Sequence, residues 1–499
     1  MILKERRLLD ETFDYVIVGS GAAGATAARV LADTGAQIAV VEEGPAVTKA
    51  KFDDRVFPTF RRMFRGMGSQ VARGRTVIPV LQGSCLGGST VVNSAIVKRM
   101  PTDVWEAWKI EYGLGDVLPL DALQGHWDQI ERELSVRPAP AEIWGENNRL
   151  LDLAKNRLGV SAAPTRRNES GCRGSARCSL GCPHGAKQSM LVTYLPYAAE
   201  RGAILLTSAR VDKVILDKDR AVGVTGHFHV PQSQRNIAPF TLRARKGVII
   251  AASAIQTPIL LAKSGVRSRH LGKHFQGQPG LSLMGLFDEK VNMWFGATQG
   301  YESDQYQLDR IRIQTLSLPP EMVFARLLGV GREWVENMAQ SANMALWAVV
   351  LRAYAQGSVH SRPWGTDIRF DLTPEDMINL RKGLRFTAEL LFAAGAREII
   401  TGIHGMPDRL TNPNQARLLG TGPADPACYS FAMTHLFGTA RMSVRASDGV
   451  VGTDFAVHGT KYFYVIDSSI FPTNLGVNPQ HTIMGIAMHA AKKIAKANE

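Results

Sequence analysis

Residues 14–42, DYVIVGSGAAGATAARVLADTGAQIAVVE, decide the fold. The run DYVIV at 14–18 is a continuous β-branched stretch of the kind that is buried in a parallel sheet, and a second such run, QIAVV, follows at 37–41. Between the two runs stand a glycine turn and a helix of small residues that stops at Gly35. This order of strand, turn, helix and strand predicts an α/β fold with a parallel sheet.

The glycine turn, GSGAAG, has the spacing G-x-G-x-x-G at Gly19, Gly21 and Gly24. The first glycine permits a tight turn, the second lets the backbone approach a pyrophosphate, and the third allows the helix to pack closely on the strand. The N-terminus of the helix offers free N–H groups and a dipole to the phosphates. Glu42 follows about twenty residues on, where an acid accepts hydrogen bonds from an adenosine ribose. The stretch therefore predicts a dinucleotide site.

Length and composition narrow the classes of protein. A chain of 499 residues exceeds one compact domain, so we expect two domains or one α/β domain with a second lobe. The chain is 45% hydrophobic and 21% charged, which excludes disordered and fibrous proteins. No run of about 18 apolar residues occurs, so no transmembrane helix is expected. Residues 1–14 hold an Arg pair without an apolar run, which indicates neither a secretory nor a twin-arginine signal and favours a cytoplasmic protein.

The chain is basic, with a formal net charge of +13. Such a charge favours nucleic acid, anionic lipid or an acidic redox partner. No zinc-finger, RNP or polybasic-helix motif accompanies it, so we expect no nucleic-acid partner, and no motif indicates contact with a membrane surface.

The remaining elements are read from apolar periodicity. We expect amphipathic helices within 104–160, strands within 204–250, and a second helix-forming block at 321–357 that is rich in Met, Leu, Val and Ala. Near the end, KYFYVID at 461–467 predicts a strand, and the stretch that begins PQHTIM at 479 predicts a helix. Because these elements interleave, we expect the nucleotide domain to be assembled from separated segments.

Further motifs suggest a family. They are GSCLGGSTVVNSA at 83–95, VIIAASAIQTPILLAKSGV at 248–266, THLFGTARMS at 434–443 and YVIDSSIFPTNLGVNPQHTIMGIA at 464–487. Together with the glycine turn, and in this order, they resemble the glucose–methanol–choline (GMC) oxidoreductase family, which binds FAD. The region from about 280 to 420 does not align with any particular member.

The resemblance implies an α/β fold in which a Rossmann-like FAD-binding domain carries a substrate lobe with an antiparallel sheet. The expected boundaries are 1–110, 200–275 and 428–499 for the FAD-binding domain, 111–199 for a helical and cysteine-rich insert, and 276–427 for the substrate-binding domain.

The resemblance also implies how FAD is held. The glycine pair and its neighbours would lie along the flavin, a valine backbone would touch the adenine, and an acid would anchor the ribityl and pyrophosphate region. The matching residues, in that order, are Gly87, Gly88, Ser89 and Asn93, then Val211, then Asp467. Some members carry a His covalently bonded to the flavin just before the Asn, whereas this chain has Val92, so non-covalent FAD is expected.

Two residues of the tail match the family's catalytic positions. His435, in HLFGT, would act as a base, because hydride leaves an alcohol carbon easily only as the hydroxyl proton is removed. Asn478, in NPQHT, would hydrogen-bond the substrate oxygen without competing for its proton. The expected activity is FAD-dependent oxidation of a small-molecule primary or secondary alcohol to an aldehyde or ketone. An oxygen-using oxidase and a hydroxynitrile lyase that uses FAD structurally stay open.

Cys172, Cys178 and Cys182 lie within eleven residues, and Pro183 follows. The short spacing and the Cys-Pro ending suggest a metal or iron–sulfur site. The segment is similar to bacterial fructose and glucose dehydrogenases of the family, in which three Cys ligate a 3Fe–4S cluster. Such a cluster would pass electrons to an external carrier protein or a small partner subunit. Structural thiols, or zinc with His184 as a fourth ligand, are the alternatives.

Overall fold

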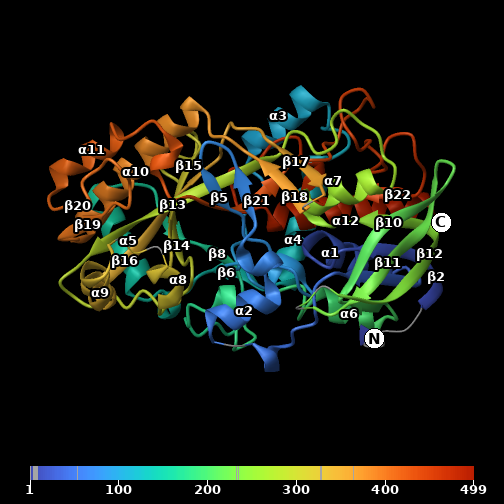
Figure 1. Ribbon diagram of the computed structural model, residues 1–499, viewed down its shortest axis with the longest axis horizontal. Helices are drawn as coiled ribbons and strands as arrows, with labels where there is room; N and C mark the ends of the chain where they lie inside the picture. The colour runs from blue at the N-terminus through green and yellow to red at the C-terminus, as the bar shows by residue number, and fades with distance from the viewer. Residues whose placement is uncertain are drawn as a thin grey trace.

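The computed structural model describes residues 2–3 and 9–498, apart from 53, 232, 234, 326, 328 and 364. The Arg pair at 6–7 lies outside the described residues. Two large sheets, each with its own apolar core, stand at opposite ends of an elongated molecule (Figure 1). Both marked chain ends lie at the end formed by the first sheet.

The first sheet confirms the predicted α/β fold. Its strands run in the order β1-β9-β3-β2-β12-β11-β10, and β22 also pairs with β12. All pairs are parallel except β10–β11 and β11–β12. The strands are β1 (Ile2–Leu3), β2 (Leu9–Val18), β3 (Ile38–Glu42), β9 (Ile204–Thr207), β10 (Ala209–Asp217), β11 (Arg220–His229), β12 (Asn236–Ile250) and β22 (Phe463–Val465).

Helices from distant parts of the chain pack beside this sheet. The predicted helix of the glycine motif is α1 (Ala22–Ala32), and it contacts the C-terminal helix α12 (Gln480–Ala497). The amphipathic helix α4 (Leu120–Glu133) packs on α12. In the chain, α4 follows α3 (Thr102–Tyr112). The predicted segment 248–266 forms the end of β12 and then α7 (Ser253–Lys263).

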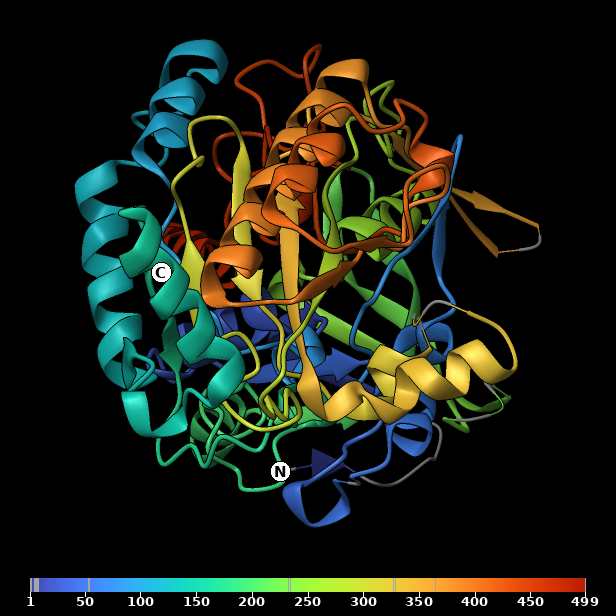
Figure 2. The ribbon, with the colours of Figure 1, turned by 90° about the vertical axis from the view of Figure 1, so that its left-hand side faces the viewer.

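The second sheet is antiparallel, as expected for the substrate lobe. Its order is β20-β19-β13-β16-β15-β14-β7, and β21 also pairs with β13. Helices α10 (Pro374–Ala394) and α5 (Glu146–Leu158) pack against each other, and α10 also packs on β13, β15 and β16, as the end-on view shows (Figure 2). The strands are β7 (Ala163–Pro164), β13 (Gln276–Leu286), β14 (Tyr301–Ser303), β15 (Ile311–Thr315), β16 (Met344–Leu351), β19 (Glu398–Ile400), β20 (Arg409–Leu410) and β21 (Ala432–Phe437).

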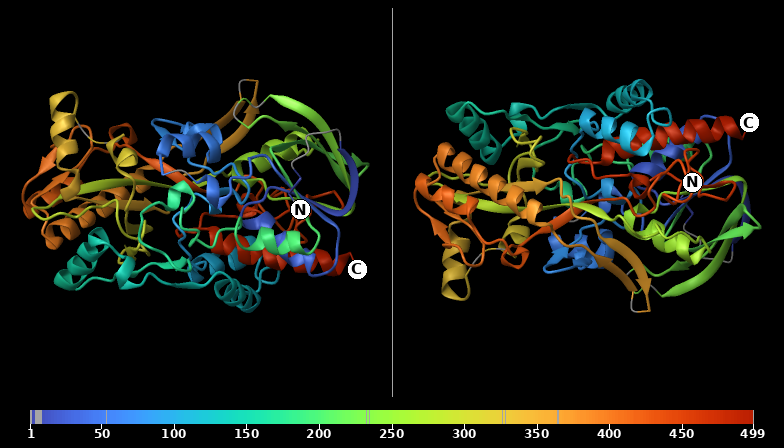
Figure 3. Two further views of the ribbon diagram at one scale, coloured as in Figure 1. Left: turned by 90° about the horizontal axis from the view of Figure 1, so that it is seen from below. Right: turned by 90° about the horizontal axis from the view of Figure 1, so that it is seen from above.

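A smaller four-stranded sheet links early and late parts of the chain. Its order is β17-β18-β4-β5, and the hairpin of β17 and β18 projects from the body (Figure 3). The strands are β4 (Val71–Arg73), β5 (Val77–Pro79), β17 (Ser358–Arg362) and β18 (Gly365–Arg369). None of the described helices has the length and apolar character needed to cross a membrane.

The helix-forming block predicted at 321–357 is wrong in its second half. Helices α8 (Pro320–Phe324) and α9 (Arg332–Ala339) do form, but residues 344–351, MALWAVVL, make the central strand β16. This strand is buried almost throughout, between β13 and β15. A short apolar run without alternation does not distinguish a doubly covered strand from a buried helix.

The predicted domain boundaries stay a prediction, but the two cores show where the segments pack. The first core draws on residues from 9–41, 86–134, 190–261 and 437–494. The second draws on 72–80, 150–162 and 254–436. Segment 111–199 therefore contributes to both cores: α4 packs against α12, and α5 packs against α10.

Candidate active site

One cavity joins the two sheets. Its volume is about 940 Å³, and its wall runs from the glycine turn after β2 to strands β13, β15, β16 and β21 of the second sheet. Most of the residues predicted to bind the dinucleotide or to act in catalysis line it: Gly19, Gly21, Glu42, Gly88, Ser89, Asn93, Val211, His435, Asp467 and Asn478. Gly24 and Gly87 are not among the lining residues: Gly24 lies in the first turn of α1 (Ala22–Ala32), and Gly87 directly precedes Gly88.

Two of the three glycines in the first glycine motif have no room for a side chain. Gly19 has φ +101°, and a Cβ added to it would lie 2.3 Å from the carbonyl oxygen of Ala251. A Cβ on Gly24 would lie 1.9 Å from the carbonyl oxygen of Gly19. By contrast, nothing lies within 4 Å of a Cβ built on Gly21, which lines the cavity at the start of α1. The helix N-terminus is thus open to a phosphate group.

Glu42 connects the two glycine motifs. Its carboxylate accepts hydrogen bonds from Ser20 N at 3.1 Å, Ser20 Oγ at 2.6 Å and Gly44 N at 2.8 Å. The same Ser20 hydroxyl accepts from Gly87 N at 2.9 Å, so one buried serine joins the turn at 19–24 to the turn at 87–93. Burial raises the pKa of Glu42. Its predicted bond to a ribose stays a prediction, and the contacts present assign it a role in holding the loops.

The second glycine motif lies against the first. Gly88 has φ +56°, and a Cβ on it would lie 2.8 Å from Gly21 Cα. Ser89 Oγ accepts from Gly83 N at 3.0 Å, and the Asn93 side chain donates to Gln480 Oε1. Val92, which stands where some family members carry a His, is buried and lines the cavity.

The cavity fits a bound FAD. Two buried side-chain atoms in its wall, Gln82 Oε1 and Gln480 Nε2, have no hydrogen-bond partner among the described residues, so both are available to a polar ligand. Val211 lies on β10 at a bulge in the pairing with β11 and reaches the cavity from the first sheet.

Asp467 binds the N-terminal turn of helix α7 next to the cavity. Its carboxylate accepts from Ser253 N at 2.9 Å and Thr257 Oγ1 at 2.6 Å, both in α7, and from Ser469 N at 2.8 Å. Burial raises its pKa. The acid therefore fixes the two backbone turns that border the cavity, and its predicted contact with the ribityl and pyrophosphate region stays a prediction.

His435 and Asn478 meet across the cavity although 43 residues separate them. Asn478 Nδ2 lies 3.2 Å from His435 Nε2, and His435 Nδ1 lies 2.8 Å from Gln278 Oε1. The Gln278 Nε2 group donates to Val477 O at 3.0 Å, which turns its Oε1 toward the ring. Gln278 Oε1 therefore accepts a hydrogen bond from Nδ1–H, which keeps the proton on Nδ1, and the lone pair of Nε2 faces Asn478 and the cavity.

The same regions of the chain match a known family. Residues 13–280 match the N-terminal GMC oxidoreductase model, and residues 353–487 match the C-terminal one. The chain belongs to the GMC oxidoreductase family. The predicted resemblance is thereby confirmed, and with it the oxidoreductase class and FAD as the cofactor of the family fold.

Relatives of this GMC oxidoreductase cover nearly all of it. An uncharacterised GMC-type oxidoreductase of Mycobacterium tuberculosis is 35% identical over 96% of this chain and 75% of its own length. A long-chain-alcohol oxidase of Arabidopsis thaliana is 27% identical over 99% of this chain and 68% of its own length. The solved structure of a formate oxidase variant from Aspergillus oryzae has a TM-score of 0.75 at 16% identity and covers 98% of this chain and 99% of that one, which supports the fold.

The cysteine segment of this GMC oxidoreductase does not form a ligand cluster. Cys178 Sγ accepts from Arg167 Nη2 at 3.3 Å, and Cys182 Sγ accepts from Lys187 N at 3.4 Å, so these thiols face different partners. Among the described residues, no group of three or more His, Cys, Asp or Glu side chains is placed to hold a metal ion. The predicted iron–sulfur site at Cys172, Cys178 and Cys182, and its zinc alternative, therefore have no support in the geometry.

The cysteine-rich segment and the residues next to it instead hold the backbone that follows the second glycine motif, and we call this set of hydrogen bonds the clasp. Lys187 is buried, and its Nζ donates to three backbone carbonyls: Val91 O at 2.5 Å, Asn93 O at 2.8 Å and Cys178 O at 2.7 Å. Arg167 Nη1 donates to Ser94 O at 2.7 Å. Burial lowers the pKa of Lys187 to about 8. Sequence reasoning assigned Lys187 no role, because a single Lys carries no motif.

Proposed function

We propose that the protein oxidises a primary alcohol that carries an extended apolar chain, with FAD held non-covalently. The proposal rests on one observation: a single cavity joins the glycine turns, the His435–Asn478 pair and an apolar wall. The long-chain-alcohol oxidase relative supports the same substrate class.

The wall beyond His435 suits an uncharged substrate. The strands of the second sheet contribute no Asp, Glu, Lys or Arg among the described residues that line the cavity. The lining side chains of these strands are mostly apolar and include Leu281, Met284, Leu346 and Val350. Leu316, directly after β15, and Met322, on α8, extend the apolar wall. A charged substrate would lose its hydration against this wall without a partner, whereas an alkyl chain gains about 0.8 kcal/mol for each buried methylene.

The polar side chains at one end of the cavity are placed to deprotonate the hydroxyl group of the alcohol and to stabilise the resulting negative charge. His435 Nε2, unprotonated because Nδ1 holds the proton, accepts the hydroxyl proton of the alcohol. Asn478 Nδ2 donates a hydrogen bond to the oxygen that carries the developing negative charge. FAD, when bound, supplies the acceptor for the hydride of the carbinol carbon.

A series of straight-chain alcohols tests the proposal under anaerobic conditions. We expect alcohols to bleach the flavin absorbance, with an apparent second-order rate constant that rises about fourfold per added methylene until the cavity is filled. Choline and a sugar serve as charged and polar controls. A flavin that no alcohol bleaches would contradict the proposal and favour a lyase or a binding protein.

Oxygen is the proposed electron acceptor, and hydrogen peroxide the second product. The long-chain-alcohol oxidase relative supports this choice, and the cysteine segment offers no support for an iron–sulfur relay. Mixing the reduced protein with air-saturated buffer checks it. Slow reoxidation by oxygen together with fast reoxidation by an artificial acceptor would instead favour an external carrier protein.

The pH dependence follows from the state of His435. Burial, together with the nearby Arg312 guanidinium, lowers the pKa of His435 to about 3. Because this value lies below the usual 6.5, the imidazole stays unprotonated between pH 5 and 8. We therefore expect the rate of flavin reduction at limiting alcohol to be flat over this range in anaerobic stopped-flow experiments. A loss of rate toward acid with a midpoint near pH 6.5 would contradict the assignment.

A further inference from the structure

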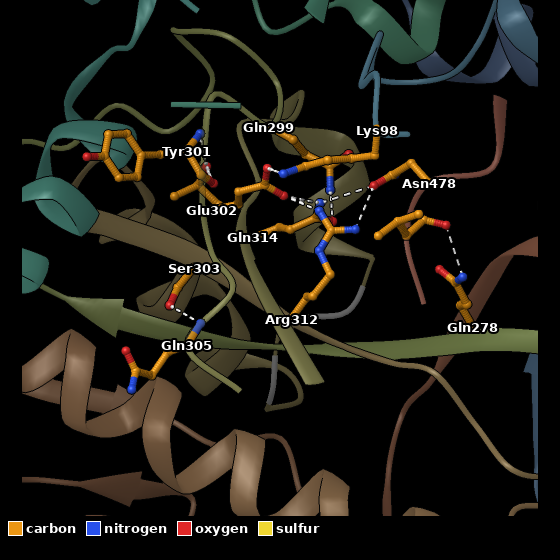
Figure 4. A network of polar contacts seen from close by, with 12 residues as sticks. Lys98, Gln278, Gln299, Tyr301, Glu302, Ser303, Gln305, Arg312, Gln314 and Asn478 are labelled. Atoms are coloured by element: carbon orange, nitrogen blue, oxygen red, sulfur yellow. Dashed lines mark hydrogen bonds and ion pairs between the residues drawn. The ribbon is translucent and has the colours of Figure 1, made fainter. Parts of the chain in front are cut away.

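A buried ionic cluster lies directly behind Asn478. Arg312, on β15, forms an ion pair with Glu302, on β14, and Lys98 forms a second ion pair with the same carboxylate (Figure 4). Arg312 and Glu302 are each 3% exposed. Neither residue lines the cavity, whereas Asn478 does, so Asn478 separates the cluster from the substrate space.

The cluster contacts only one end of the Asn478 amide. Asn478 Oδ1 lies 3.2 Å from Arg312 Nη1 and 3.4 Å from Gln314 Nε2, and both groups are donors. The opposite end, Nδ2, faces His435 Nε2 at 3.2 Å. The two ends of an amide have nearly the same shape, so hydrogen-bond partners decide which end points where. A guanidinium can only donate, so it selects the oxygen.

We propose that Arg312 is a positioning residue: it holds the Asn478 amide with its oxygen toward the ionic cluster and its N–H toward His435 and the substrate oxygen. Glu302 fixes the guanidinium in turn. The inference rests on the proposed function for its kinetic consequence, because a turned amide would present a second acceptor to the substrate oxygen and would no longer stabilise its negative charge.

The charges of the cluster provide a matched pair of variants. Two cations, Lys98 and Arg312, share one anion, Glu302, so the cluster carries a net charge of +1. Removal of either cation leaves one neutral ion pair and strands no buried charge. Arg312→Met removes both the net charge and the shorter of the two hydrogen bonds to Asn478 Oδ1, and it leaves the 3.4 Å bond from Gln314. Lys98→Met removes the net charge and leaves both of these bonds in place. The comparison separates positioning from electrostatics.

The kinetic test measures flavin reduction at saturating alcohol and the apparent dissociation constant of the alcohol. We expect Arg312→Met to lower the rate about 10- to 100-fold while the dissociation constant changes less than about threefold, because misorientation affects the reacting geometry more than binding. Lys98→Met should change both quantities less than about threefold. Equal losses in the two variants, or a wild-type rate in Arg312→Met, would overturn the proposal.

A second measurement does not depend on turnover. The NMR signal of His435 Nε2 reports whether this nitrogen accepts a hydrogen bond. We expect the bond in the wild-type protein and in Lys98→Met and its loss in Arg312→Met; its retention in all three would overturn the positioning role.

If Arg312→Met does not fold, Arg312→Lys, which keeps one donor group and the charge, should retain the NMR signal of the hydrogen bond and most of the rate of flavin reduction. A wild-type protein that no alcohol reduces would reject the proposed function, while the NMR comparison would still decide the positioning role.

Discussion

Replacing His435 by alanine is expected to leave a yellow, FAD-containing protein whose reduction by alcohol is about 10²- to 10⁴-fold slower than in the wild type. The reason is local. His435 Nε2 is the atom held unprotonated toward the cavity, because Gln278 Oε1 accepts a hydrogen bond from Nδ1–H and so keeps the proton on Nδ1. Anaerobic stopped-flow absorbance at saturating alcohol measures the effect. Flavin content, measured on the same preparation, shows whether the site is still intact.

His458→Ala is the matched control for this variant. His458 lies in the same C-terminal region, hydrogen-bonds Ser443 Oγ at 3.1 Å and does not line the cavity. We expect it to keep the wild-type rate of reduction. If His435→Ala reduces as fast as His458→Ala, the base lies elsewhere, and the assignment carried by the motif HLFGT is wrong.

The sequence predicted those parts of the site in which function depends on local backbone shape. Gly19 and Gly88 occupy conformations and close contacts that a side chain would prevent, so their motifs are visible in the chain itself. His435 and Asn478 were predicted from the family resemblance, because each stands in a short motif that matches a catalytic position of the family. What the motifs could not show is the partner that each side chain meets.

Three of the missed residues come from the second sheet. Gln278, Arg312 and Gln314 reach the site because β13 and β15 both pair with β16, in a register fixed by contacts far apart in the sequence. Long-range register is invisible to local patterns. The predicted iron–sulfur site has no support in the geometry for a different reason. Closeness in sequence suggested one shared metal site, whereas Cys178 and Cys182 accept hydrogen bonds from different partners in the folded loop.

Replacing Lys187 by methionine is expected to weaken FAD binding about 10- to 100-fold, which corresponds to about 1.4–2.7 kcal/mol. Methionine has a similar length but no donor, so the carbonyl oxygens of Val91, Asn93 and Cys178 would lose the ammonium that now serves all three. An unsatisfied buried acceptor costs about 1–3 kcal/mol, and removal of a buried charge offsets part of that cost. Titration of the apoprotein with FAD, followed by flavin fluorescence, measures the change.

Cys178→Ser and Cys172→Ser distinguish this clasp from a role of the thiols themselves. Lys187 bonds the backbone carbonyl of Cys178, which serine keeps, so both serine variants should bind FAD as the wild type does. If the three thiols instead held a metal ion, the serine variants should lose more FAD binding than Lys187→Met. Each serine would remove one metal ligand, while Lys187→Met would leave all three thiols in place. Loss of FAD from the serine variants with retention in Lys187→Met would therefore reject the clasp. Loss of FAD binding in Lys187→Met, with normal binding in both serine variants, would instead show that the cysteine-rich segment shapes the loop after the second glycine motif. It does so through the buried Lys187 ammonium and the three carbonyl groups that this ammonium bonds.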